Sequence, residues 1–229
     1  MGIAPLFSSA SRALSDLVQP EFRSVLLKSI GLALLLLAAL WGVLQGILGY
    51  FIAGLSPWLD TTIAIVAGLG MIVGAMFLIG PVSTLVAGVF LDDIAETVER
   101  NDYPADAPGR ALPVATAMIQ AVRFFGIVIL ANLGALLLLL VPGVNLIAFL
   151  VVNGYLLGRE FFELAAQRLR PRDEVVEMRR ANGGRIFVAG LIIAGFMAIP
   201  LVNLATPLFA TALMVHLHKR LSGVRPSSR

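Results

Sequence analysis

Four long stretches of this 229-residue sequence contain no Asp, Glu, Lys or Arg, and they constrain the fold more than any other feature. A helix needs about 20 apolar residues to cross the hydrocarbon core of a bilayer, and each stretch has at least 31 residues. Only 14% of all residues are charged, against about 25% in soluble domains. We therefore predict an all-α integral membrane protein. The stretches are Ser29–Leu59, Thr61–Leu91, Phe124–Gly158 and Ile186–His218.

The first two stretches are separated by a short turn, residues 56–60, and predict two long transmembrane helices, over residues 21–57 and 61–100. The second helix is expected to continue into the cytoplasm. Residues 5–19 place five apolar residues on one helical face, with the polar residues mostly elsewhere. The apolar set is Leu6, Ala10, Ala13, Leu14 and Leu17, and the polar set is Ser8, Ser9, Arg12, Ser15 and Asp16. This pattern predicts an amphipathic helix that lies on the membrane surface.

The third and fourth stretches are each interrupted near the middle, by Pro142-Gly143 and by Pro200. The resulting arms are roughly 21–27 Å long as helices, so most fall short of a core about 30 Å thick. We predict two re-entrant, half-penetrating hairpins, over 124–158 and 186–218, with four tilted full spans as the alternative. The arms are 124–141, 144–158, 186–199 and 201–218.

The two hairpins resemble an internal repeat, because Pro142-Gly143-Val144-Asn145-Leu146 matches Pro200-Leu201-Val202-Asn203-Leu204 at the two predicted tips. In the predicted topology all 17 Lys and Arg residues lie on one side of the membrane. The positive-inside rule makes that side the cytoplasm, with both termini in it. The charged connection 159–185 is then a cytoplasmic, amphipathic and helical segment.

No motif in the sequence indicates an enzyme, a cofactor or a metal site. The chain has no cysteine and lacks the serine-elbow, zinc-protease and phosphate-loop patterns. The basic residues flank apolar segments instead of forming a dense patch, which argues against nucleic-acid binding. We interpret Asp92 and Asp93, and likewise His216 and His218, as solvated groups at span ends.

Three polar positions are the candidate anion contacts. Asn145 and Asn203 lie near the predicted tips, where each either caps a helix start or helps a half-helix N-terminus to hold an anion. Arg23 lies in the first turn of the helix that begins near Glu21, either facing phospholipid or binding an anion with free helix-start amides. We take Arg23 with its neighbours Phe22 and Ser24, together with both asparagines, as the candidate substrate-binding residues.

Several motifs, in this order and spacing over about residues 8–222, resemble the CysZ sulfate-permease family and the wider etoposide-induced-protein-like family. The resemblance implies two long transmembrane helices, two pairs of half-penetrating helices and an oligomer. A Gly-Leu-Arg motif is associated with sulfate in the family, and here the triplet is Glu21-Phe22-Arg23, so only the arginine matches. The motifs are Gln19–Arg23, Phe90–Ala95 with Val98-Glu99, Asn153–Phe162 and Pro200–Pro207.

The resemblance also implies a function. It predicts a passive, ATP-independent channel or permease of the bacterial inner membrane that supplies sulfate, or a related oxyanion, for cysteine synthesis. Membrane lipid and other copies of the chain are the expected partners. The alternative is a non-transporting structural or interaction protein of the same wider family, whose cytoplasmic segment 159–185 recruits partners or shapes the bilayer.

Overall fold

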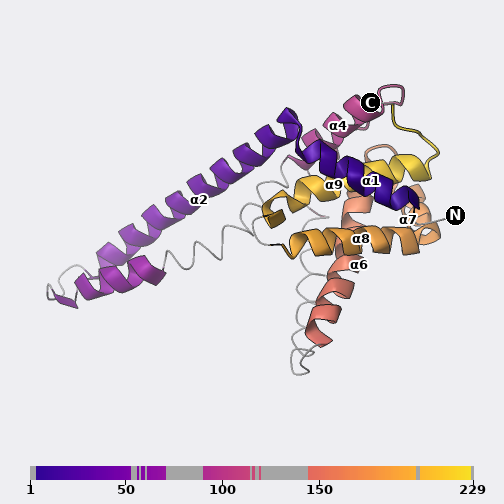
Figure 1. Ribbon diagram of the computed structural model, residues 1–229. Helices are drawn as coiled ribbons and strands as arrows, with labels where there is room; N and C mark the ends of the chain where they lie inside the picture. Colours follow the sequence, from indigo (N-terminus) through magenta and orange to yellow (C-terminus); the bar gives the residue numbers. More distant parts are fainter. Residues whose placement is uncertain are drawn as a thin grey trace. The chain divides into compact units, whose positions relative to one another are not determined.

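In the computed structural model, every described element is helical (Figure 1). The chain forms two compact units, one made of Ser24–Phe90 and the other of Met1–Arg23 together with Leu91–Arg229. The all-helical prediction is confirmed for the part of the chain that the structure describes. The described residues are 4–52, 56, 58–59, 61–70, 90–113, 115–116, 119, 144–199 and 202–227.

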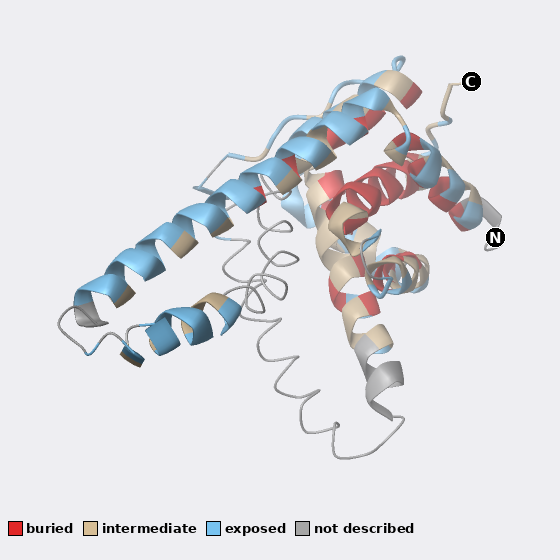
Figure 2. Cartoon of the chain, turned by 60° about the vertical axis from the view of Figure 1, so that its left-hand side comes forward, coloured by how far each residue is buried: buried red, intermediate tan, exposed pale blue. Residues whose placement is uncertain are grey.

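The unit Ser24–Phe90 is dominated by helix α2 (Pro20–Ile52), whose first four residues belong to the other unit. Its stretch Pro20–Tyr50 is, within the described ranges, the one helix long and apolar enough to cross a membrane, and only 6% of its most apolar window is buried. Figure 2 shows most of this long helix in the colour of exposed residues. Thr61–Gly70 is also helical, whereas 71–89 of the second predicted span lies outside the described residues.

The other unit is a bundle around one central helix, α9 (Thr206–Leu221). Every residue from Thr206 to Lys219 is buried, because α1, α4, α6 and α8 pack against α9 from different sides. A helix covered on all sides needs no polar face, and α9 accordingly lacks a clear amphipathic pattern. The surrounding elements are α1 (Ala4–Leu17), α4 (Leu91–Asp102), α6 (Val144–Gln167), α7 (Arg172–Ala181), α8 (Gly183–Met197) and η1 (Val202–Ala205).

Helices α6 and α8 cross with their backbones in close contact. A Cβ atom on Gly190 of α8 would lie 1.8 Å from the carbonyl oxygen of Gly154 and 2.8 Å from the Cα of Gly158, both on α6. Only glycine allows two helix backbones to pass at this distance. The crossing therefore depends on glycines from both helices.

Helix α1 corrects part of the sequence interpretation. A helix forms where residues 5–19 predict one, but Leu6, Ala10 and Ala13 are buried, and α1 packs on α9. Most of the apolar face that was assigned to the membrane surface thus belongs to the protein core. Leu14 of that face is exposed instead, and Asp16, which was placed off the face, is buried. Phe7, Leu14 and Val18 are the apolar residues that this segment leaves exposed.

The predicted arms differ in how far the structure describes them. The first arm and the tip Pro142-Gly143 lie outside the described residues, and α6 continues the second arm without a break into the charged connection as far as Gln167. The remainder of that connection is helical, in α7 and the start of α8. In the last stretch, α8 ends at Met197 and α9 begins at Thr206. Insertion of these helices into the bilayer stays a prediction.

Candidate functional site

The predicted anion contacts at the start of α2 differ in exposure. Arg23, Ser24 and Glu21 are exposed, so each is accessible to a solute, whereas Phe22 is buried. The backbone N–H of Arg23 already donates to the carbonyl oxygen of Gln19, at 3.1 Å. An anion near Arg23 therefore has the guanidinium, but not the N–H group of the same residue, as a donor.

The two asparagines are placed on different elements. Asn203 lies in η1, partly exposed, and its backbone N–H donates to the carbonyl oxygen of Ile199 at 3.0 Å. It is not the N-cap of α9, because Ala205 holds that position without a side-chain cap. Asn145 is in the first turn of α6, and its side chain lies outside the described set. No hydrogen bond or ion pair within the described residues joins Arg23 to Asn203.

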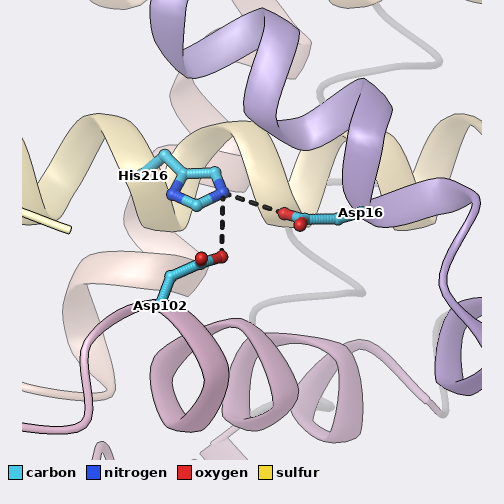
Figure 3. A group of neighbouring side chains, drawn as sticks. All are labelled: Asp16, Asp102 and His216. Atoms are coloured by element: carbon cyan, nitrogen blue, oxygen red, sulfur yellow. Dashed lines mark hydrogen bonds and ion pairs between the residues drawn. The ribbon is translucent and has the colours of Figure 1, made fainter. Parts of the chain in front are cut away.

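A buried polar cluster, which the sequence did not predict, lies between α1, α4 and α9. His216 of α9 is completely buried, and its Nε2 lies 2.9 Å from a carboxylate oxygen of Asp16 and 3.8 Å from one of Asp102 (Figure 3). Its Nδ1 is 2.8 Å from the hydroxyl of Tyr103. Arg12 approaches Asp102 from the partly exposed edge, at 3.9 Å. We call Asp16, Asp102 and His216 the Asp-His cluster.

Burial and the neighbouring Asp102 carboxylate raise the pKa of the Tyr103 hydroxyl well above its usual range. The phenol is therefore neutral at physiological pH, and its oxygen can either donate to or accept from His216. The Tyr103 ring also lies under the Lys219 ammonium, 5.7 Å from the ring centroid. Lys219 is itself buried and pairs with Asp106, which lowers the pKa of that carboxyl.

A second ion-pair group joins the C-terminal end of α6 to α4. Arg168 and Glu99 are each only 4% exposed, and their closest side-chain atoms lie 3.3 Å apart. The backbone N–H of Gly109 donates to the other oxygen of Glu99, at 2.9 Å. Arg168 also pairs with Asp92, which is half exposed. Glu99 thus fixes both Arg168 and the loop that follows α4.

Glu160 is a further perturbed acid in α6. Burial and, to a smaller extent, the neighbouring Glu163 carboxylate raise its pKa to about 7, although Arg159 acts in the opposite direction. Glu163 in turn pairs with Arg159 and with Arg179 of α7, each at 3.0 Å. The pair between Glu163 and Arg179 holds α7 against α6. Glu160, with its raised pKa, is partly protonated near neutral pH.

The histidines are the clearest error of the sequence interpretation. His216 and His218 were expected to be solvated at the end of a span, but both are buried, His218 with its ring edge-on to Phe162. Asp92 and Asp93 are both exposed, which fits the solvated interpretation, and Asp92 also forms an ion pair with Arg168. One signal was available: Asp16 lies three residues after Ala13 on α1, beside the buried face.

Residues 9–207 match the family described as sulfate transporter CysZ/etoposide-induced protein 2.4. The chain belongs to this family. A comparison with curated proteins found no match. The family match covers Arg23, Asn145 and Asn203, and it ends at the second residue of α9. His216 of the Asp-His cluster therefore lies beyond the region that the family comparison covers.

Proposed function

We propose that this protein is a passive, ATP-independent channel or permease that carries sulfate across the bacterial inner membrane into the cytoplasm, where sulfate feeds cysteine synthesis. Membership of the CysZ/etoposide-induced family supports a membrane, transporter-like role. The exposed apolar surface of α2 supports it physically, because about 31 residues of helix span roughly 46 Å, more than a core of about 30 Å requires.

Arg23 is the residue that we propose contacts the anion. Its side chain is exposed in the first turn of α2, where the helix dipole favours negative charge and makes a lone cation unfavourable. A bound anion would interact favourably with the helix dipole and would also balance the charge of Arg23, through charge-assisted hydrogen bonds from the planar guanidinium. The exposed Glu21 on the same turn acts against a dianion and is expected to weaken its binding.

The test is uptake of radiolabelled sulfate by liposomes that contain the purified protein, without ATP. Wild-type protein should carry sulfate down its gradient, and Arg23→Ala should reduce uptake by roughly tenfold or more, since about 1.4 kcal/mol of lost binding is a factor of ten. Arg23→Lys should restore part of it, because lysine keeps the charge without the bidentate fork. Glu21→Gly should increase uptake.

Lys28→Ala is the matched control for general charge effects, because Lys28 is another exposed cation on the same helix. It should transport like the wild type. If folded, inserted wild-type protein carries no more sulfate than empty liposomes, the non-transporting alternative holds. If Arg23→Ala and Lys28→Ala carry as much as wild type, transport stands but Arg23 is not the anion contact.

We further propose that both termini are cytoplasmic and that the two hairpins enter the bilayer from that side. Single cysteines are readily introduced, because the chain has none. A membrane-impermeant thiol reagent applied to intact cells should label a cysteine at Asp60 and spare one at Val144 or Leu201. Strong external labelling at either hairpin position would favour four full spans.

A further inference from the structure

Three side chains with metal-binding chemistry meet in the interior of the helical bundle. Asp16 comes from α1, Asp102 from the last residue of α4 and His216 from α9, and one ligand atom of each lies within 4.8 Å of the others (Figure 3). All three residues are buried. We propose that this Asp-His cluster binds one divalent transition-metal ion of the Zn²⁺ type. No sequence motif indicated a metal site, because Asp16 and His216 are 200 positions apart.

The spacing of the ligand atoms suits such an ion. Zn²⁺ binds nitrogen and oxygen ligands at about 2.0–2.2 Å in a tetrahedral arrangement, which separates neighbouring ligand atoms by roughly 3.4 Å. The Nε2 of His216 lies 2.9 Å from Asp16 and 3.8 Å from Asp102, so the two distances bracket that value. Small side-chain shifts would admit the ion in place of the proton between His216 and Asp16.

The second nitrogen of His216 supplies an independent observation. Histidines that bind metals through one ring nitrogen usually donate the N–H of the other to a fixed acceptor, which sets the tautomer and the ring orientation. Here Nδ1 lies 2.8 Å from the buried hydroxyl of Tyr103. Tyr103 can accept from Nδ1–H, and the Nε2 lone pair then points at the two carboxylates.

The donor set indicates the class of metal. One imidazole nitrogen and two carboxylate oxygens suit Zn²⁺, Mn²⁺ or Fe²⁺, whereas Ca²⁺ and Mg²⁺ prefer oxygen ligands and Cu⁺ prefers sulfur. The two carboxylates balance the charge of a dication. The Arg12 guanidinium lies 3.9 Å from one carboxylate oxygen of Asp102, and His216 approaches the other oxygen. Arg12 therefore does not occupy the space between the three ligands.

The competing occupant of the same space is a proton, which would make His216 a cation between two carboxylates. A binding measurement separates the two cases. The purified full-length protein, with its purification tag removed, is stripped by a chelator and then dialysed against limiting Zn²⁺. The wild type should retain about one Zn²⁺ per chain, whatever its activity in sulfate uptake.

Variants locate the ion. Asp16→Asn and His216→Gln should each weaken Zn²⁺ binding by at least tenfold. Tyr103→Phe should weaken it by roughly tenfold to a hundredfold, as is typical when the group that orients a metal-binding histidine is removed. His218→Gln is the matched control, because His218 is buried on the same helix two residues later but contacts Phe162 instead of the cluster. This variant should bind like the wild type.

A measurement on the wild type alone keeps the proposal testable if a variant fails to fold. X-ray absorption of the Zn²⁺-loaded protein should show one imidazole and oxygen ligands at about 2.0–2.2 Å. Wild-type protein that retains no Zn²⁺ after dialysis would overturn the proposal and leave the cluster as a proton-held ion pair. Equal loss of binding in His216→Gln and His218→Gln would also overturn it, because the ion would then lie elsewhere.

Discussion

Replacing Gly190 by alanine tests the glycine crossing of α6 and α8 with a single methyl group. The new Cβ would lie 1.8 Å from the Gly154 carbonyl oxygen, and ordinary contact begins near 3.4 Å, so the two backbones must separate by about 1.6 Å at this point. The atoms that the new Cβ would meet, the carbonyl group of Gly154 and the Cα of Gly158, belong to the backbone and not to the flexible end of a side chain. Both helices would have to move as bodies, and the packing of α6 on α8 would loosen around the crossing.

The expected cost follows from that displacement. A gap of about 0.5–1 Å already forfeits a quarter to a half of the dispersion attraction between facing atoms, and overpacking a core usually costs about 1–3 kcal/mol. We expect about 3 kcal/mol here, offset by about 1 kcal/mol because alanine favours the helix more than glycine does. The net loss of about 2 kcal/mol corresponds to a melting temperature about 4–8 °C lower for a chain of this size.

The assay is thermal unfolding of the detergent-solubilised protein, followed by circular dichroism and by the loss of monodisperse protein. Gly195→Ala is the matched control, because Gly195 is exposed on the same helix and a Cβ there would meet nothing within 4 Å. It should melt at the same temperature or up to about 4 °C higher. Equal melting of Gly190→Ala and Gly195→Ala would refute the close crossing of α6 and α8.

Two further substitutions test the buried charges. Glu160→Gln should stabilise the protein by at most about 3 kcal/mol at pH 8 and have no effect below pH 4.5. Because the pKa of Glu160 is raised to about 7 in the folded state, its ionisation costs no folding free energy below pH 4.5, an increasing amount between pH 4.5 and 7, and the full amount above pH 7. A melting difference that does not change with pH would contradict this. Arg168→Met should destabilise by about 3–5 kcal/mol, because it leaves Glu99 charged and buried. Arg170→Ala removes a surface pair with Glu174 and one hydrogen bond to Ser222, and it should cost at most about 2 kcal/mol in the same melting assay.

The helices were predictable from the sequence where one local property determined them. The charge-free stretch after Lys28 predicted α2, and the helix begins at Pro20, next to the expected Glu21. The division of the last stretch near Pro200 corresponds to separate helices α8 and α9. Hydropathy and proline positions act within a few turns of chain, so they carry this information without any knowledge of the fold.

The Asp-His cluster was not predictable in the same way, because its members become neighbours only when α1 packs against α9. An isolated His216 in an apolar run fits a span end as well as a core, and the deciding partner, Asp16, is 200 positions away. The same holds for Glu99 and Arg168, which lie on different helices. Periodicity placed Asp16 off the apolar face of α1, and it could not show that a buried histidine lies opposite.

The central position of α9 has a consequence for the order in which the protein assembles. Translation produces α1, α4, α6 and α8 before the helix on which all four pack. The contact between α1 and α9 closes almost the whole length of the chain, and such distant contacts form slowly. The ribosome therefore releases α1 with the apolar residues Leu6, Ala10 and Ala13 uncovered, and the bilayer surface or a chaperone must shelter them until α9 emerges.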